Sequence, residues 1–316
     1  MTLEVIEISG LATIQDSGRV GWRRFGVPAS GPMDPFASRA ANALVENPVE
    51  YAVLEIGLGD ATFQARQDCL VAVTGMGYKL SSYIWEFPLW TSFFVRAGWK
   101  IHLNKTDTGM WAYLAVTGGI QTQPVLGSRS TYLRGGFGGL EGRQLQAGDI
   151  IPTGKLPLLP YELAARTFTE EARPDYQENP VIDVIMGPQT SYFRDESVEL
   201  FLSSEYSISL TSDRMGYRLE GPTLIHRTKV ELISEGMAYG AIQVPAGGQP
   251  IVMMPDGPPT GGYPKIGTVS SADLPLLAQC LPNKSRLRFR ETTVDRAQEK
   301  YRQFMRNLQS SIVEAE

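Results

Sequence analysis

The stretch Ser17-Gly-Arg-Val-Gly-Trp-Arg-Arg-Phe-Gly26 returns 195 residues later as Ser212-Asp-Arg-Met-Gly-Tyr-Arg-Leu-Glu-Gly221, with five identities in ten positions. Weaker similarity continues downstream of both stretches. A match at a fixed offset is the signature of an internal repeat. The sequence therefore predicts a duplicated module, covering about residues 3–105 and 180–290.

Around these stretches, short apolar or alternating runs follow one another, separated by Gly, Pro and Asp. Such runs, with no regular helices between them, favour antiparallel barrels or sandwiches over a doubly wound sheet. We therefore expect a mainly β protein made of two duplicated β modules with a few short helices. The predicted strands are residues 3–8, 52–56, 69–74, 93–95, 100–103, 111–116, 181–185, 207–210, 229–233, 241–244, 251–254 and 285–289.

Three helices are predicted from the residues at their ends. Asp34 is expected to cap the first, with Pro35 at its first position. Ser271 is expected to cap the second, with Asp273 in its first turn. The third begins near Thr292 and is amphipathic. Its predicted apolar stripe consists of Val294, Ala297, Tyr301, Phe304, Leu308 and Ile312.

The length of 316 residues suits about two domains of ordinary size. The proline-containing stretch 156–179 is the natural connector between them. We expect the first β module, with extra strands and this connector, at residues 1–175. The second β module is expected at residues 176–291 and a C-terminal amphipathic helix at residues 292–316.

The composition excludes several functional classes. A net charge of −5 provides no basic surface for nucleic acid or for an anionic membrane. Two Cys and two His, far apart in the sequence, do not have metal-ligand spacing, so no metal site is expected. Cys69 and Cys280 are expected to be buried free thiols. The acidic N-terminal stretch is unlike a signal peptide and the longest apolar run, residues 110–116, is too short to span a bilayer, so a soluble cytoplasmic protein is expected.

The familiar catalytic motifs are missing. The sequence contains no GxxxxGK[ST] phosphate loop, no GxGxxG and no GxSxG. This argues against a self-contained nucleotidase or serine hydrolase. What remains is a set of loops rich in small residues, hydroxyls and arginine.

Two such loops lie in the first half of the chain. The turn at residues 26–34 leads into a helix N-terminus, where Ser30 and backbone N–H groups can hold an anionic oxygen. Alternatively, the turn is only a tight connection and Asp34 only a cap. In the loop at residues 126–131, Arg129 lies among hydroxyls, which suits carboxylate or phosphate recognition or simple solvation, and Arg143 can join it.

The second half contains an irregular loop at residues 255–265 with many prolines and glycines. Loops of this kind often present functional groups from a rigid scaffold. Asp256 and Lys265 can act there as an acid/base pair or as a structural ion pair. Their spacing alone does not decide between the two.

Several stretches together resemble a family known as the biotin-dependent carboxyltransferase domain, allophanate hydrolase subunit 2, or the KipA-like C subunit of bacterial 5-oxoprolinase. They occur in one order over about residues 11–290. The stretches are Gln15-Asp-Ser-Gly-Arg-Val-Gly21, Gly26-Val-Pro-Ala-Ser-Gly-Pro-Met-Asp34, Leu126-Gly-Ser-Arg-Ser-Thr131, Gly138-Gly-Leu-Glu-Gly-Arg143, Ser212-Asp-Arg-Met-Gly-Tyr-Arg-Leu219, Gly240-Ala-Ile-Gln243 and Thr260-Gly-Gly-Tyr-Pro-Lys-Ile266.

The resemblance implies two cyclophilin-like β-barrels and a partnership with a KipI-like subunit. In the prokaryotic 5-oxoprolinase, a third, LamB/YcsF-like subunit completes an assembly that hydrolyses 5-oxo-L-proline to L-glutamate at the expense of ATP. The missing phosphate loop suggests that ATP is bound by, or shared with, the partner subunits. This chain departs from the family pattern at Gly257 and Pro258, where the family has arginine and glutamine. Either the substrate therefore differs, or another basic residue substitutes for that arginine.

Two other functions stay open. One is a carboxyltransferase acting on urea or another amide with a separate biotin carrier. The other is a non-catalytic regulator that, like KipA, binds a KipI-like kinase inhibitor. We expect the site residues to line one groove between the two modules. They are Asp34, Asp256, Tyr263 and Lys265 as catalytic residues, and Arg19, Ser30, Ser128, Arg129, Arg143, Arg214, Gln243 and Thr260 for substrate or anion binding.

Overall fold

The computed structural model describes residues 2–155, 160–227 and 232–314. The chain forms two compact units. Unit 1 consists of Met1–Arg19, Ser30–Pro174 and Met305–Glu316, and unit 2 consists of Val20–Ala29 and Asp175–Phe304. The break after Pro174 lies next to the end predicted for the first module, whereas the assignment of residues 20–29 to unit 2 was not predicted.

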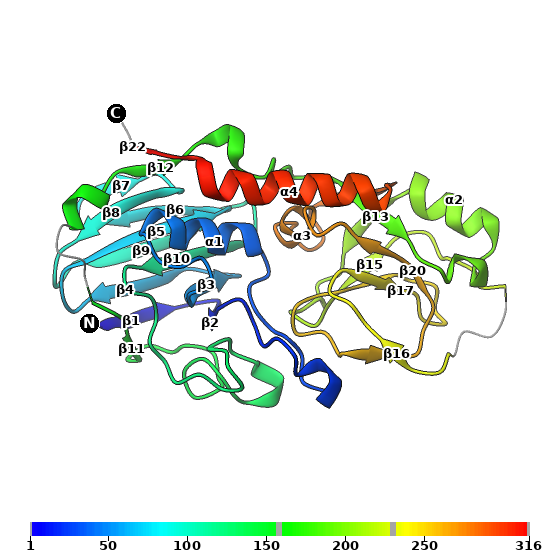
Figure 1. The fold of residues 1–316 in the computed structure, drawn as a ribbon, viewed down its shortest axis with the longest axis horizontal. Helices are drawn as coiled ribbons and strands as arrows, with labels where there is room; N and C mark the ends of the chain where they lie inside the picture. The colour runs from blue at the N-terminus through cyan, green and yellow to red at the C-terminus, as the bar shows by residue number, and fades with distance from the viewer. Residues whose placement is uncertain (1, 156–159, 228–231, 315–316) are drawn as a thin grey trace. The chain divides into compact units, whose positions relative to one another are not determined.

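Unit 1 contains two sheets (Figure 1). The six-stranded sheet has the order β11 (Ile150–Pro152), β1 (Thr2–Ile8), β4 (Ala61–Ala65), β9 (Lys100–Lys105), β6 (Tyr78–Ser82) and β7 (Trp85–Phe87). The seven-stranded sheet has the order β2 (Leu11–Gln15), β3 (Val53–Gly57), β10 (Trp111–Val116), β5 (Cys69–Gly75), β8 (Thr91–Val95), β12 (Arg166–Phe168) and β22 (Ile312–Glu314).

The core of unit 1 lies between these sheets, where side chains such as Leu54, Val71 and Leu114 meet Val5 and Phe63. Strands β5 and β10 are buried along their whole length. A strand that is buried on both faces reads as a continuous apolar run. The second face is covered by α1 (Pro35–Leu44), which lies across β5 and β10 in Figure 1.

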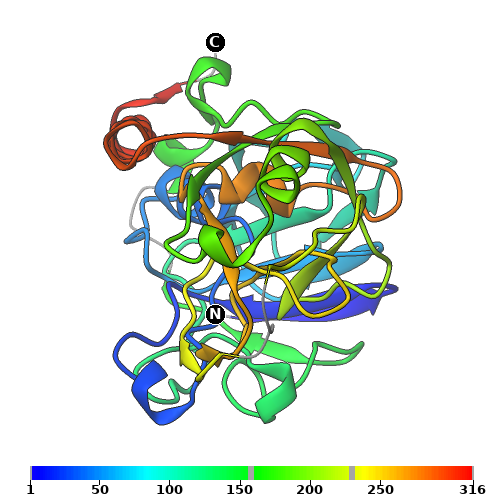
Figure 2. The same cartoon turned by 90° about the vertical axis from the view of Figure 1, so that its right-hand side faces the viewer.

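Unit 2 is built around a closed barrel, whose strands are also seen in Figure 2. Alternate residues such as Tyr217, Ile242, Val252 and Ile266 are buried, because successive side chains of a strand point to opposite faces. The barrel order is β13 (Val181–Met186), β20 (Lys265–Val269), β17 (Ala241–Gln243), β18 (Ile251–Met253), β15 (Gly216–Glu220), β14 (Glu205–Ile208) and β21 (Arg286–Glu291). Beside it, β16 (Glu235–Gly236) pairs with β19 (Thr260–Gly261).

The mainly β fold with few helices is confirmed. Ten of the twelve predicted strands coincide in large part with observed ones. The prediction at 207–210 overlaps β14 by half, and the prediction at 229–233 lies mostly outside the described residues. The five-residue strands β2, β4, β6, β15 and β20 were missed, as were shorter strands such as β7, β11 and β12. Unit 2 contains a closed barrel, while the strands of unit 1 form two sheets. Within the described ranges, no helix is long and apolar enough to span a membrane.

The first predicted helix is confirmed. Oδ1 of Asp34 accepts the backbone N–H groups of Phe36 at 3.1 Å and Ala37 at 2.9 Å, and Pro35 occupies the first position of α1. The prediction that Ser271 caps the second helix is wrong, because α3 (Leu274–Ala278) begins three residues later. Proline fits the first turn of a helix, and Pro275 is at the start of α3.

The expected position of Asp273 in the first turn of α3 is also wrong. Asp273 is the N-cap residue, but its carboxylate makes no cap bond, because it accepts hydrogen bonds from Lys300 and from the backbone of Asp183. The helix α2 (Asp195–Ser203) of unit 2 was not predicted. Its buried Phe201 stacks on Phe289 of β21, with the two ring centroids 4.6 Å apart.

The third predicted helix is confirmed as α4 (Val294–Ser310), with Ala297, Phe304 and Leu308 buried as expected. Two members of the predicted stripe are wrong. Val294 is 51% exposed. Ile312 lies in β22, where it pairs with Phe168 of β12, because the edge of the seven-stranded sheet satisfies its backbone groups.

Candidate functional site

The residues singled out from the sequence divide between the two units. The groove expected between the two modules stays a prediction. Unit 1 contains Arg19, Ser30, Asp34, Ser128, Arg129 and Arg143, and unit 2 contains Arg214, Gln243, Asp256, Thr260, Tyr263 and Lys265.

In unit 1, the loop with Ser128 and Arg129 is bound to the carboxylate of Asp16. Oδ1 of Asp16 accepts hydrogen bonds from the hydroxyls of Ser128 and Ser130, and Oδ2 accepts the backbone N–H of Arg129. Nε of Arg129 donates to the carbonyl of Thr122 at 2.8 Å. The hydroxyl and guanidinium expected to recognise an anion are thus engaged inside unit 1.

Arg19 is buried, with 1% of its surface exposed. Its Nε donates to the carbonyl of Val125 at 3.3 Å and a terminal nitrogen donates to the carbonyl of Ser130. The guanidinium also lies over the ring of Phe137, 4.8 Å from its centroid. Through these contacts Arg19 stabilises the loop that contains Val125 and Ser130.

Arg143 forms a two-point ion pair with Asp149, with distances of 2.7 and 2.8 Å, and also contacts Glu141. The hydrogen bonds from Arg143 lower the pKa of the Asp149 carboxyl. Arg143 therefore has carboxylate partners of its own, and none of these contacts involves the loop of Arg129.

The N–H groups in the turn before α1 have partners within unit 1. Asp34 is fully buried and its carboxylate already caps the helix. Ser30 has a positive φ of 56°, and its buried hydroxyl has no hydrogen-bond partner among the described residues. The backbone N–H groups of Gly31, Met33 and Asp34 donate to Gln15 Oε1 at 3.2 Å, Glu55 Oε2 at 2.7 Å and the Tyr113 hydroxyl at 2.7 Å.

Glu55 and Tyr113 are two polar residues of this region that the sequence reasoning missed. The Tyr113 hydroxyl donates to Glu55 Oε2 at 2.9 Å, and both residues are fully buried. Burial first, and then the negative charge of Glu55, raise the pKa of Tyr113, which keeps its hydroxyl a donor. A carboxylate inside the apolar run of β3 was the signal available in the sequence.

In unit 2, the predicted pairing of Asp256 with Lys265 is wrong. Asp256 forms a buried ion pair with Arg214, with Nε–Oδ2 at 2.9 Å and a second hydrogen bond at 3.3 Å. The backbone N–H of Asp256 also donates to the Arg214 carbonyl at 2.9 Å. Both side chains are only 5% exposed, so this pair joins the two segments of unit 2 and presents little surface to a substrate.

Lys265 instead contacts Glu235, which the sequence reasoning missed. Nζ of Lys265 lies 2.9 Å from Oε1 of Glu235, and the backbone N–H of Lys265 donates to Gln189 Oε1 at 2.7 Å. Nε2 of Gln189 donates in turn to Glu235. The hydrogen bond from Lys265, and then that from Gln189, lower the pKa of the Glu235 carboxyl. Three segments distant in the sequence therefore meet at one lysine.

Gln243 joins these residues, since it pairs directly with Lys265 between β17 and β20. A Cβ atom at Gly261 would lie 3.1 Å from Oε1 of Gln243, so the glycine leaves room for the Gln243 amide. Thr260 is exposed in β19, and Tyr263, two residues before Lys265, is 38% exposed. We call Gln189, Glu235, Gln243 and Lys265 the Lys265 cluster.

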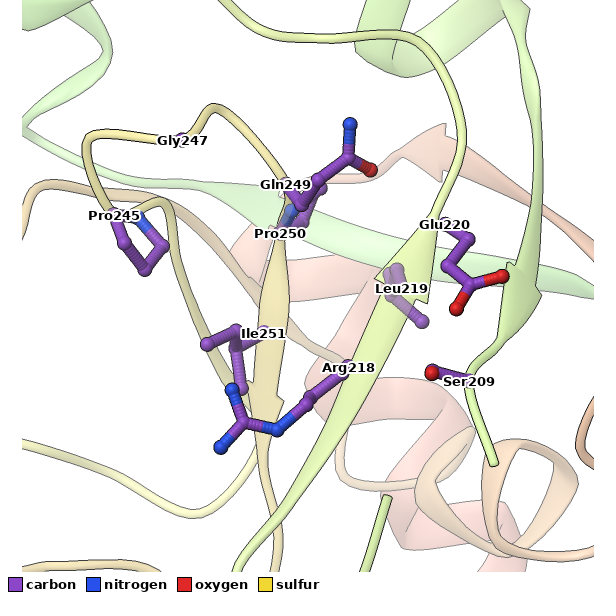
Figure 3. Close-up of a pocket in the computed structure, with 9 residues that line it drawn as sticks. All are labelled: Ser209, Arg218, Leu219, Glu220, Pro245, Gly247, Gln249, Pro250 and Ile251. Atoms are coloured by element: carbon purple, nitrogen blue, oxygen red, sulfur yellow. The ribbon is translucent and has the colours of Figure 1, made fainter. Parts of the chain in front are cut away.

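A shallow groove of about 270 Å³ lies on the same barrel (Figure 3). Arg218 and Glu220 of β15 line it, together with Ile251 of β18 and the turn from Pro245 to Pro250. In Figure 3 the Arg218 side chain lies beside Ile251, and Glu220 points the other way, toward Ser209. The groove thus has a basic side and an acidic side.

The Lys265 cluster has the chemistry of a polar site that acts on a carbonyl. An ammonium held by a carboxylate can donate a hydrogen bond to a carbonyl oxygen on which negative charge develops. An amide such as Gln243 can donate to the same oxygen or fix the orientation of the bound molecule. The side chain of Lys265 is 15% exposed, so its ammonium group is partly desolvated.

Comparisons with known proteins relate this chain to one domain family. The model of the family described as "Carboxyltransferase domain, subdomain A and B" matches residues 25–291. Two curated relatives are named as the C subunit of 5-oxoprolinase. The one from Escherichia coli strain K12 is 40% identical over 281 residues and the one from Haemophilus influenzae is 38% identical over 280 residues. Each alignment covers 88% of this chain and 87% of the relative.

Among solved structures, the crystal structure of the K. lactis urea amidolyase superposes with a TM-score of 0.90 and 26% identity. The superposition covers 99% of this chain, which spans only 21% of that protein. The family match covers most of the chain and agrees with both observed units. The chain therefore belongs to the carboxyltransferase domain family with subdomains A and B.

Proposed function

We propose that this chain is the C subunit of an ATP-dependent 5-oxoprolinase, which hydrolyses 5-oxo-L-proline to L-glutamate. The observation that carries the proposal is the likeness to two curated proteins of that name at 38% and 40% identity. Since the alignments cover 87% of each relative, the likeness extends well beyond one shared segment.

The two curated relatives are named as subunits, and a subunit works with other subunits. We propose that the partners are a KipI-like protein and a LamB/YcsF-like protein, and that the complex works in the cytoplasm. The site is then completed only in the complex, which agrees with the modest groove that unit 2 presents.

We further propose that ATP is bound mainly by the partner subunits. A triphosphate requires several free donors at one place. In unit 1 the N–H groups before α1 and the hydroxyl of Ser128 already donate to protein groups. The guanidinium of Arg143 is engaged by Asp149. These residues do not fit a phosphate site of their own.

The proposed reaction breaks the C–N bond of the lactam. The oxygen of one water enters the new carboxylate and the nitrogen takes a proton to become the amine, while a second water is consumed as ATP becomes ADP and phosphate. An unstrained lactam needs its carbonyl activated before water attacks. In our proposal the Lys265 ammonium donates to the lactam oxygen, while Glu235 and Gln189 keep it in place.

Reconstitution tests the proposed function. The chain is mixed with the KipI-like and LamB/YcsF-like proteins, and ADP and glutamate are measured with and without 5-oxoproline. We expect 5-oxoproline-dependent release of both only when all three proteins are present. An unchanged rate when this chain is omitted would overturn the proposal.

The role of Lys265 has a separate test in the same complex. Lys265→Met removes the ammonium, and we expect kcat to fall about 100- to 1,000-fold, as for loss of one donor to a developing oxyanion. Lys284→Met, at an exposed lysine of unit 2, is the matched control and should leave kcat unchanged. Equal activity of the two variants would show that Lys265 takes no part in the reaction.

A carboxyltransferase acting on urea or another amide is the second candidate. It is favoured by the superposition on the K. lactis urea amidolyase, with its TM-score of 0.90. This function requires a separate biotin carrier, because the chain has no Met-Lys-Met acceptor motif. Urea-dependent loss of the carboxyl group from a carboxybiotin carrier, with no turnover of 5-oxoproline, would favour this candidate.

A further inference from the structure

Arg218 belongs to the repeated stretch, yet the proposed function gives it no role. Its backbone is fixed within the barrel, because its N–H donates to the Ser212 hydroxyl at 2.9 Å and its carbonyl accepts the N–H of Ser209 at 2.8 Å. Its guanidinium forms no hydrogen bond or ion pair within the part of the chain that the structure describes. By contrast, Arg214 and Arg288 of the same unit pair with Asp256 and Glu205.

Arg218 lies in one row with the Lys265 cluster across four neighbouring strands. It pairs with Ile251 of β18, and Ile251 pairs with Gln243 of β17. Gln243 pairs with Lys265 of β20 just past a register shift, and Ile266 beside Lys265 is fully buried, so Lys265 points outward. Residues directly opposite each other in antiparallel strands point to the same face of a sheet. The row therefore lies on the outside of the barrel.

The burial of the neighbouring residues agrees with this face. Tyr217 and Leu219 on either side of Arg218, and Val252 and Ile242 next to Ile251 and Gln243, are at most 1% exposed and point inward. Strands are spaced by about 4.8 Å, so the positions of Arg218 and Gln243 lie about 10 Å apart. The Arg218 side chain lies beside Ile251, the residue between these two positions in the row (Figure 3).

The groove beside Arg218 suits a small molecule with one carboxylate and an apolar body. Ile251, Pro245 and Pro250 provide apolar surface, and the free guanidinium provides two parallel donors for a carboxylate. Glu220 also lines the groove, but Figure 3 shows its carboxylate on the side of β15 that faces Ser209. A bound carboxylate is therefore attracted to the Ile251 side of the groove.

We infer that Arg218 binds the carboxylate of the substrate and so selects carboxylate-bearing lactams over plain ones. This inference rests on the proposed function and deepens it. The Lys265 cluster acts on the amide carbonyl of the bound molecule, and Arg218 holds its other polar end.

The test uses the complete complex and two γ-lactams, 5-oxoproline and 2-pyrrolidone, which lacks the carboxylate. With 5-oxoproline as substrate, Arg218→Gln should raise KM about 10- to 100-fold, as for loss of a charge-assisted hydrogen bond. With 2-pyrrolidone, the same substitution should leave KM, or the inhibition constant if there is no turnover, unchanged. Arg218→Lys should lie between the wild type and Arg218→Gln.

Arg286→Gln is the matched control, because Arg286 is an exposed strand residue on β21, on the side of β15 away from β18. It should leave the constants for both lactams unchanged. The inference is overturned if Arg218→Gln leaves KM unchanged with 5-oxoproline as substrate, or raises the constants for both lactams together. No turnover of 5-oxoproline by the wild-type complex would instead overturn the proposed function itself.

Discussion

Gly138 shows how tightly single residues are fitted around the buried guanidinium of Arg19. It has a positive φ of 76°, and a Cβ at this position would overlap the carbonyl oxygen of Ser130 and the Arg19 side chain. Gly136, in the same loop, has a φ of 66° but no atom within 4 Å of its would-be Cβ. An alanine at Gly136 therefore introduces backbone strain alone, whereas an alanine at Gly138 introduces both backbone strain and steric overlap.

Gly138→Ala is expected to lower the free energy of unfolding by about 2–4 kcal/mol. About 1–2 kcal/mol comes from the left-handed backbone and the rest from displacement of tightly packed neighbours. Gly136→Ala should show only the backbone part. The free energy is measured by urea unfolding of the purified chain, followed by circular dichroism. Equal losses in the two variants would show that the Arg19 packing contributes nothing.

At the residue scale, the sequence predicted what depends on neighbours along the chain. The capping of α1 by Asp34 was predicted because the residue and its targets are adjacent. The partners of Asp256 and Lys265 were not, because they come from Arg214 and Glu235, which lie 42 and 30 residues away. The spacing of two charges in one loop gives no information on such partners.

At the scale of elements, α4 is attached to unit 2 by one ion cluster. Nζ of Lys300 lies 2.9 Å from Asp183 and 2.5 Å from Asp273, and Arg290 lies 2.7 Å from Asp183. Burial raises the pKa of the Asp273 carboxyl. Burial also acts to raise that of Asp183, but hydrogen bonds from Arg290 and Lys300 outweigh it and lower the pKa of Asp183. The cations thus hold two buried carboxylates at the base of the helix.

Lys300→Met is expected to lower the free energy of unfolding by about 1–3 kcal/mol at pH 7. The loss is below the ~3–5 kcal/mol of fully buried pairs, because the Lys300 side chain is 42% exposed and partly screened by water. The lowered pKa of Asp183 contributes stability above its unfolded value of about 3.9, and this is lost as the pH falls through the folded pKa. The difference from wild type should therefore shrink below about pH 4.

The control for this helix is Arg302→Met, which removes an exposed cation whose polar contacts, among the residues that the structure describes, are with Glu299 and Gln298 of α4 itself. It should change stability by less than about 0.5 kcal/mol at every pH. The attachment proposed for Lys300 is contradicted if its variant resembles this control, or if its loss of stability grows as the pH falls.

Element positions were predicted best where apolar runs are continuous. Strands such as β5 and β10 are buried on both faces and read directly from the sequence. The missing cap bond of Asp273 and the place of Ile312 were not predicted, because the Lys300 contact to Asp273 and the sheet edge that pairs with β22 are tertiary features. Local residue patterns do not contain them.

At the scale of the whole molecule, the internal repeat and the turn-rich composition predicted a mainly β chain, and this is confirmed. The site was predicted only in part. Gln243 and Lys265 are brought together in unit 2, whereas Ser128, Arg129 and Arg143 have internal partners in unit 1. Whether a polar group is free for a ligand depends on the complete set of its neighbours, which only the folded chain defines.

The proposed function makes this chain a working subunit of a 5-oxoprolinase. The most direct measurement is a titration, in which increasing amounts of this chain are added to fixed amounts of the KipI-like and LamB/YcsF-like proteins while glutamate formed from 5-oxoproline is measured with ATP present. We predict that glutamate formation rises from the background to a plateau at a fixed ratio of this chain to its partners. A rate that stays the same over the whole titration would contradict the proposed function.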